Sequence, residues 1–420
     1  MRELIAYSAM AATVGLTVIR PAITPSWRVG PATAAGFGAL VMLAAGVVGW
    51  RDVAASGALH WRPFVTIVSI MTVAAVARET SVMDALARRI FASPVQTAHG
   101  LFVRVFLFSA LVSSILNNDA MVLLVTPLVI ALVRQRFPGR EELAVPFAFA
   151  VFLSIGVAPF VVANPMNMIV ASYAHLNFNQ YASWMIPVAV AGWAVVLPLA
   201  AWFFRRELAA MAPEGGEPPA SETAMDGSQK AIVALLLAMV AAYPVVALID
   251  GPSIWLVAFA GAAVALALSV RSAAGVRQTV IYSVDWNILV FLLSVYVLAV
   301  GMRNVGLIDF IASFYSTMNL AVIGGVSALG SALVNNHPMA IINLLALEAV
   351  PEAGRREILA ALVGGDIGPR LLPIGSLAGL LWIESCRRSK VAIPLRTFMA
   401  VGILVTVPSM AVSLLILWLR

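Results

Sequence analysis

A polar motif occurs once in each half of the chain, both times inside a stretch that is otherwise apolar. Residues 109–122, SALVSSILNNDAMV, align without gaps to residues 327–340, SALGSALVNNHPMA, and seven of the 14 columns are identical. Farther upstream, RETSVMDALA at 78–87 resembles RNVGLIDFIA at 303–312, and the two share an arginine and an aspartate. The chain is therefore an internal duplication, so its fold must accommodate the same polar-tipped element twice.

The composition around this motif is typical of an integral membrane protein. Of the 420 residues, 62% are hydrophobic and 11% are charged, whereas soluble domains carry about 25% charged residues. The basic residues behind the net charge of +6 fall mostly in short loops between apolar segments. This distribution predicts a membrane topology and no nucleic-acid partner.

The signatures of several enzyme classes are absent from the sequence. Its single cysteine, Cys386, excludes an internal disulfide and a cage of thiols around a metal. There is no HExxH, no P-loop GxxxxGK, and no Gly-x-Ser-x-Gly or Gly-x-Gly-Asp. We therefore predict a protein that is not an enzyme and has no metal site or cofactor. An intramembrane enzyme or a channel subunit is the least favoured class.

Segment lengths predict that the repeated element is a re-entrant hairpin. A helix needs about 20 apolar residues to cross a bilayer. Only 16 and 14 apolar residues flank the polar NND at 117–119, and the second copy around NNHP at 335–338 is similar. We expect hairpins over about 98–136 and 318–350, with their polar tips near the bilayer midplane.

Each predicted hairpin is followed by an apolar stretch that proline and glycine interrupt. Residues 145–174 contain VANPMNM, and residues 358–384 contain GGDIGPRLLPIGS. Such breaks leave backbone groups unpaired, which is tolerated inside a membrane only beside protein or a polar cavity. Short hairpins and broken helices at matching places in two halves indicate a secondary transporter with its site at the interface of the repeats.

The predicted fold is an all-α integral membrane protein of two inverted-topology repeats. Residues 1–204 form the first repeat and residues 231–420 the second. The linker at 205–230 is rich in Pro, Gly, Ser and acidic residues, a composition that predicts disorder. We expect ten transmembrane helices plus two re-entrant hairpins, with one broken helix per half. Five crossings per repeat is an odd number, so the second repeat is inverted relative to the first.

The distribution of Lys and Arg predicts the orientation. Seventeen of these residues fall in loops on the side of the linker and seven on the opposite side. By the positive-inside rule, the linker is cytoplasmic and both termini lie outside. We expect a multi-pass protein of the cell inner (plasma) membrane.

Four titratable or charged residues lie within the predicted membrane segments. An ionisable residue at that depth costs roughly 2.5–3.5 kcal/mol on insertion scales and is functional by default. Asp119 has no basic residue near it in the sequence, and burial favours its protonated form, which suits a proton carrier; a cation ligand and a helix cap are the alternatives. Asp366 and Arg370, one helical turn apart, are predicted to form a charge pair. Asp366 and His337 are the other candidates for proton coupling.

Amide side chains are the predicted substrate-binding groups. The asparagines at the tips could serve only as hairpin caps, or bind solute as well. Helix N-termini that meet at the midplane would add N–H donors. These groups suit a small polyhydroxyl or oxyanion ligand. The candidates are Asn117, Asn118, Asn335, Asn336, Asn164 and Asn167, with Ser376 on the second broken helix.

These motifs resemble those of the ArsB-type arsenite efflux permeases of the ion transporter superfamily. The most specific stretch is GGDIGPRLLPIGSLAGLLWI at 364–383, and the order of motifs covers essentially the whole chain. The resemblance implies export of arsenite and antimonite coupled to inward protons, sometimes with a partner ATPase. It places the following residues in the site region: Asn117, Asn118, Asp119, Asn335, Asn336, Asp366, Gly375 and Ser376.

Two positions depart from the family pattern. Gly365 and His337 stand where members carry Cys and Met, so the motif has no thiol but gains a titratable group. A thiol-free site suits arsenite, which at neutral pH is mostly an uncharged trihydroxide that needs hydrogen-bond partners. The alternative is a sodium-coupled anion importer or a sodium/proton antiporter of the same superfamily. The Ser-Asn-Thr tips of its carboxylate carriers are absent here.

Overall fold

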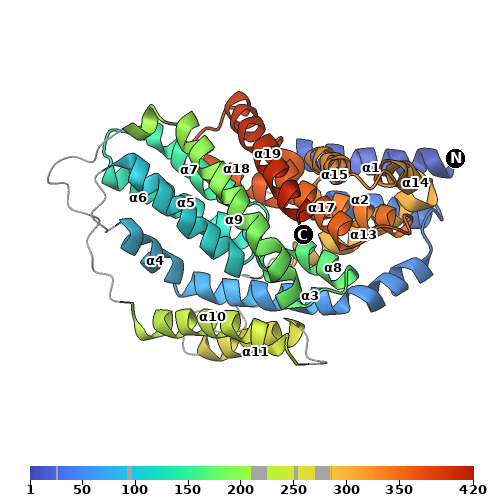
Figure 1. Cartoon of the computed structure of the whole chain (residues 1–420), viewed down its shortest axis with the longest axis horizontal. Coiled ribbons are helices and arrows are strands. Elements are labelled where there is room, and N and C mark those ends of the chain that lie inside the picture. The colour runs from blue at the N-terminus through green and yellow to red at the C-terminus, as the bar shows by residue number, and fades with distance from the viewer. Residues whose placement is uncertain (25–26, 92–96, 210–224, 250–253, 270–283, 285) are drawn as a thin grey trace.

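The computed structural model describes the chain except for residues 25–26, 92–96, 210–224, 250–253, 270–283 and 285 (Figure 1). The regular elements of the described part are helices apart from one short antiparallel pair, β1 (Ala22–Thr24) and β2 (Trp27–Arg28). The predicted all-α class is confirmed.

The described elements follow the same order in the two halves. The first half comprises α1 (Arg2–Ile19), α2 (Pro31–Ala44), α3 (Trp50–Glu79), α4 (Val82–Phe91), α5 (Ala98–Ile115), α6 (Asn118–Arg136), η1 (Glu141–Leu143), α7 (Ala144–Ser154), η2 (Val161–Ala163), α8 (Pro165–Tyr173), α9 (Phe178–Phe203) and η3 (Glu207–Ala209). The second half comprises α10 (Gly227–Val246), α11 (Ile254–Ser269), α13 (Asn287–Asn304), α14 (Leu307–Tyr315), α15 (Leu320–Val334), α16 (Asn336–Glu348), α17 (Arg355–Ile367), η5 (Gly368–Arg370), η6 (Pro373–Gly375), α18 (Leu377–Arg388) and α19 (Leu395–Trp418). The helix pair α5–α6 thus corresponds to α15–α16, and the broken helix α7–α8 corresponds to α17–α18.

The helix α10 begins inside the segment that composition assigned to the linker. Asp226 accepts a hydrogen bond from the Gln229 backbone (2.8 Å), and the Gln229 side chain accepts one from the Asp226 backbone (3.2 Å). This reciprocal capping starts the helix at Gly227, four residues before the predicted boundary at 231. Most of the predicted linker, residues 210–224, lies outside the described residues.

Helices of the two halves pack on one another in a reciprocal way (Figure 1). α2 packs on α13, and α11 packs on α3. Likewise α6 packs on α18, and α16 packs on α8. α9 and α19, the last helices of the two halves, lie side by side. In each case a helix of one half packs on the other half in the same way as its equivalent does. A two-fold relation between the halves produces this pattern.

By length and composition, seven of the described helical segments could cross a membrane: Trp61–Glu79 of α3, and α5, α6, α9, α10, α13 and α19. α5 has 18 residues. α6 has 19 residues, because it continues through Arg134 and Arg136 beyond the apolar run. Their lengths therefore do not by themselves require a re-entrant hairpin. The ten crossings and the two re-entrant hairpins remain predictions.

The two broken helices are joined by a buried tryptophan. The indole Nε1 of Trp382, on α18, donates to the carbonyl of Ala148 on α7 (3.0 Å). Phe152 stacks on the Trp382 ring with 4.7 Å between the centroids, and Phe149 meets it edge-on at 5.0 Å. Trp382 is fully buried, so this contact fixes the breaks of both halves beside each other.

Candidate functional site

Each tip carries a pair of asparagines, and the first of each pair caps the helix that follows. The side-chain oxygen of Asn117 accepts from the Asp119 backbone N–H (2.7 Å), and that of Asn335 accepts from the His337 N–H (3.3 Å). Asn335 also donates to the carbonyl of Ile374 in η6 (3.2 Å). These bonds satisfy N–H groups that a helix leaves open at its start.

The helices after the two breaks begin in the same way. Asn164 caps α8 by accepting from the Met166 N–H (3.2 Å), and Ser376 caps α18 by accepting from the Gly379 N–H (2.9 Å). Four helix N-termini, those of α6, α8, α16 and α18, are therefore each capped by a polar residue that the sequence marked as a candidate.

A small cavity of about 30 Å³ brings residues of both halves together. Asn118, Asp119, Asn164, Asn336, His337, Asp366, Arg370 and Ser376 are the predicted site residues that line it. On this measure the cavity has room for about two water molecules. We call it the central cavity. The structure thus collects eight of the predicted residues from the starts of α6, α8, α16 and α18, the end of α17, and η5.

The remaining predicted residues lie around the central cavity. Asn117 and Asn335 line two neighbouring cavities. Asn167 is fully buried beside Tyr181. A Cβ on Gly375 would lie 2.7 Å from the Pro369 Cα, so the glycine lets η6 pack against η5.

Asp366 and Arg370, the predicted charge pair, interact electrostatically, and each also has a hydrogen-bond partner in the other half. The guanidinium donates to the carbonyls of Leu153 (2.9 Å) and Ile155 (2.7 Å), where α7 ends in the other half. Asp366 accepts a hydrogen bond from Asn164 Nδ2 (3.3 Å). The break in α7 frees these carbonyls, and a buried cation is a strong donor for them. Arg370 therefore caps a helix of the opposite repeat, while both charged groups line the central cavity.

Several polar atoms of residues that line the central cavity have no hydrogen-bond partner among the described residues. They are Asn336 Oδ1, His337 Nε2, Asp366 Oδ2 and Arg370 Nε. Buried polar groups are nearly always paired in folded proteins. Two unpaired acceptor oxygens, one ring nitrogen and one guanidinium N–H donor suit a ligand that carries several hydroxyl groups.

Asp119 lies between two cavities. It lines the central cavity and also a second one of about 60 Å³, which we call the Arg78 cavity and which Asn117, Leu377 and Leu381 also line. Sequence proximity did not predict that Arg78 and Asp119 share a cavity, because α3 and α6 meet only in the folded chain. The duplication did mark Arg78, because the second repeat has an arginine at the equivalent position, but it did not indicate a role for the residue.

A larger cavity of about 360 Å³ lies on the other side of the first break. Val161 and Met168, on either side of Asn164, belong to its wall, together with Arg62 and His175. We call it the Arg62 cavity. The sequence offered no signal for it, since its walls come from α3, η2, α8, α9, α10 and α11.

In the part of the chain that the structure describes, no three His, Cys, Asp or Glu side chains are placed to hold a metal ion. The thiol of Cys386 is free and buried on α18, one turn beyond Trp382. It is not among the residues that line the central cavity.

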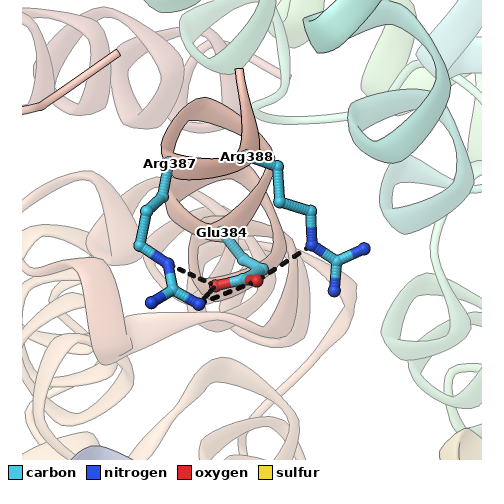
Figure 2. Close-up of polar contacts among 3 residues, drawn as sticks. All are labelled: Glu384, Arg387 and Arg388. Atoms are coloured by element: carbon cyan, nitrogen blue, oxygen red, sulfur yellow. Dashed lines mark hydrogen bonds and ion pairs between the residues drawn. The ribbon is translucent and has the colours of Figure 1, made fainter. Parts of the chain in front are cut away.

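The exposed end of α18 carries a compact charged cluster. Glu384 pairs with Arg387 (2.8 Å) and with Arg388 (2.9 Å), as Figure 2 shows. Nearby, the Arg134 guanidinium donates to the carbonyl of Ser389 (2.8 Å), which ties α6 to this end of α18. Surface pairs of this kind add little stability, so the cluster mainly holds basic side chains at the end of the helix.

Comparisons with known proteins agree with the membrane-transporter architecture. The sequence model of a family described as arsenical pump membrane protein matches residues 13–420. An arsenical pump membrane protein of Escherichia coli is 28% identical over 408 residues, covering 92% of each chain. A putative arsenical pump membrane protein of Bacillus subtilis is 25% identical and covers 85% of this chain and 88% of its own.

Two solved structures share the fold at low sequence identity. The YdaH transporter of Alcanivorax borkumensis superposes with a TM-score of 0.57 at 15% identity, covering 99% of this chain and 95% of its own. The Neisseria gonorrhoeae MtrF structure, described among antimetabolite efflux pumps, gives a TM-score of 0.54 at 12% identity, covering 99% and 93%. At these identities the likeness concerns the fold alone.

Proposed function

Because the chain belongs to the arsenical pump membrane protein family, ArsB, we propose that it is a secondary active exporter of arsenite and antimonite driven by proton antiport. In this proposal it is a multi-pass protein of the inner membrane, with the segment 205–230 cytoplasmic and both termini outside. The two halves act as inverted repeats around the central cavity. The cycle needs no ATPase, although a separate subunit could act from the cytoplasmic side.

The central cavity is the observation that carries this proposal. Its lining offers the amides of Asn118 and Asn336 and the unpaired oxygens of Asn336 and Asp366. Arsenite at neutral pH is mostly an uncharged trihydroxide, so each of its O–H groups can donate to such an oxygen and accept from an amide N–H. Oxygen and amide groups of this kind bind the neutral solute through hydrogen bonds and release it more readily than thiolates would.

Proton coupling follows from carboxylates in the same cavity as the solute. An ionised carboxylate accepts hydrogen bonds from arsenite hydroxyls, and protonation removes one such acceptor. Loading from the cytoplasm with the carboxylate ionised, and release outside as a proton binds, produces antiport. Asp119 is the first candidate for the carrier, and Asp366 and His337 are the others. Each charge that crosses gains about 2.3 kcal/mol per 100 mV, roughly a 50-fold gradient.

The cavities around the central one suggest a route for the solute. With the linker side cytoplasmic, the Arg78 cavity lies toward the cytoplasm and the Arg62 cavity toward the exterior. Asp119 separates the Arg78 cavity from the central cavity, and the turn around Asn164 separates the Arg62 cavity from the central cavity. Solute would then pass from the Arg78 cavity through the central cavity to the Arg62 cavity.

The test is arsenite uptake into inverted membrane vesicles under a proton gradient or a sodium gradient of equal size. We expect the proton gradient, with the vesicle interior acid, to drive accumulation, and the sodium gradient to have no effect. Vesicles with an inactive Asp119→Asn, Asp366→Asn double variant serve as the control. Accumulation driven by sodium alone would favour the alternative, a sodium-coupled carrier of the same superfamily.

A further inference from the structure

A chain of buried hydrogen bonds holds the second hairpin, α15–α16. Tyr315 OH, on α14, donates to Asn343 Oδ1 on α16 (2.5 Å). Asn343 Nδ2 donates to Ser327 Oγ on α15 (2.8 Å). Ser327 Oγ in turn donates to the carbonyl of Ala361 on α17 (2.5 Å). The three side chains are buried, so the chain connects both arms of this hairpin to the broken helix.

The equivalent positions of the first hairpin, α5–α6, lack this chain. The repeat alignment pairs Ser109 with Ser327, and its continuation pairs Val125 with Asn343. Valine has no hydrogen-bonding side chain. The hydroxyls of Ser109 and Thr126 are fully buried and have no partner among the described residues. An unpaired buried hydroxyl costs free energy that a shifted arrangement of the same helices can recover.

The two hairpins also contact their broken helices differently. A Cβ on Gly364 would lie 2.1 Å from the Gly324 carbonyl oxygen, and one on Gly368 would lie 2.2 Å from the Ala328 oxygen. α15 and α17 therefore meet backbone to backbone, which small residues permit. The α5–α7 interface instead contains the rings of Phe102 and Phe147, 6.0 Å apart. Side chains can change rotamer and repack, whereas a close backbone contact offers no side chains that could rearrange in this way.

We propose that the second hairpin and α17 form one rigid unit, and that the first hairpin is the element that moves when solute binds. The inference rests on the proposed function and adds an asymmetry to it. Asn343 and Ser327 are positioning residues that fix the body of the second hairpin, whose tip carries Asn336 and His337 in the lining of the central cavity. Ser331, nearer the tip, has an unpartnered hydroxyl, so the restraint acts on the body of the hairpin rather than on its tip.

Two leucines provide a matched pair of reporters. Leu111 on α5 and Leu329 on α15 are equivalent in the repeat alignment and are 58% and 61% exposed. In a Cys386→Ser background, each is replaced by cysteine and spin-labelled together with Phe259→Cys on α11, which packs on α3. Electron–electron distances are measured in nanodiscs with and without arsenite. We expect arsenite to shift the Leu111→Cys distance and to leave the Leu329→Cys distance unchanged.

A variant of the positioning residue completes the test. Asn343→Val gives the second hairpin the residue of the first, so the Leu329→Cys distances should broaden toward those at Leu111→Cys. If Asn343→Val does not fold, Tyr315→Phe removes a single donor from the same chain and should broaden them less. Equal shifts at both reporters, or a shift at Leu329→Cys alone, would overturn the inference.

Uptake by the same labelled protein separates the two proposals. Arsenite transport with equal movement of both hairpins would leave the proposed function standing and reject the asymmetry. Without arsenite transport the proposed function fails. The asymmetry then still predicts a broader ligand-free distribution at Leu111→Cys than at Leu329→Cys, and equal widths would reject it as well.

Discussion

At the residue scale, the two asparagines of each tip have different surroundings. Asn117 and Asn335 use their side-chain oxygens to cap helices, whereas Asn118 and Asn336 line the central cavity. We therefore expect Asn336→Ala to weaken arsenite binding by roughly 1–3 kcal/mol, the cost of leaving a partner unsatisfied. Titration of the purified protein with arsenite by calorimetry measures this change, and unaltered affinity would exclude Asn336 from the site.

A second prediction at this scale concerns which residue carries the proton, Asp119, Asp366 or His337. Asp119→Asn keeps the shape of the side chain and removes its titration, so it should abolish gradient-driven accumulation while arsenite exchange down its own gradient persists. Proteoliposomes report both, with Asp366→Asn measured alongside. Accumulation that survives Asp119→Asn under a proton gradient would transfer the role to Asp366 or His337.

Two adjacent glycines on α17 differ in the room that surrounds them for a side chain. A Cβ on Gly365 would lie 3.5 Å or more from Met166, Ser327 and Ser331, which is ordinary contact, whereas one on Gly364 would lie 2.1 Å from a backbone oxygen. Gly365→Ala should therefore fold and transport normally, and Gly364→Ala should lose stability by about 1–3 kcal/mol through overpacking. Thermal unfolding in detergent compares the two; equal stabilities would contradict the close approach of α15 and α17.

At the scale of elements, the caps explain why helices begin at the tips and after the breaks. Asn117→Ala should destabilise the start of α6 by about 0.5–2 kcal/mol, and Asn117→Ser, which can still cap, should restore most of it. Transport and thermal stability are measured for both variants. If Asn117→Ser is stable but inactive, Asn117 acts on the solute as well as on the helix.

The element boundaries also show what local sequence can predict. The positions of both hairpins and both breaks follow from polar tips and from proline and glycine, which act within a few residues. The start of α10 was missed because the composition of the linker outweighed a local signal, the Asp226–Gln229 capping box. That signal was present in the sequence and could have been used.

At the scale of the whole molecule, the orientation awaits a direct test. In a Cys386→Ser background, which we expect to keep transport within about twofold because the thiol lies outside the central cavity, Glu3→Cys and Ser228→Cys each introduce one exposed thiol. A membrane-impermeant maleimide applied to intact spheroplasts should label Glu3→Cys, and label Ser228→Cys only after lysis. The opposite pattern would invert the topology that the positive-inside rule predicts.

The sequence by itself determined the all-α membrane class, the duplication, the two polar tips and most of the residues that line the central cavity. These depend on apolar run lengths, on repeated motifs and on backbone-breaking residues, all of which act locally. Only the tertiary structure decided which groups meet: Arg78 reaches the neighbourhood of Asp119, and the Arg370 guanidinium caps α7 of the opposite half. Helical spacing alone places Asp366 near Arg370, one turn away in the sequence. Packing of the two halves also placed freed carbonyls, more than 200 residues away in sequence, within reach of the guanidinium.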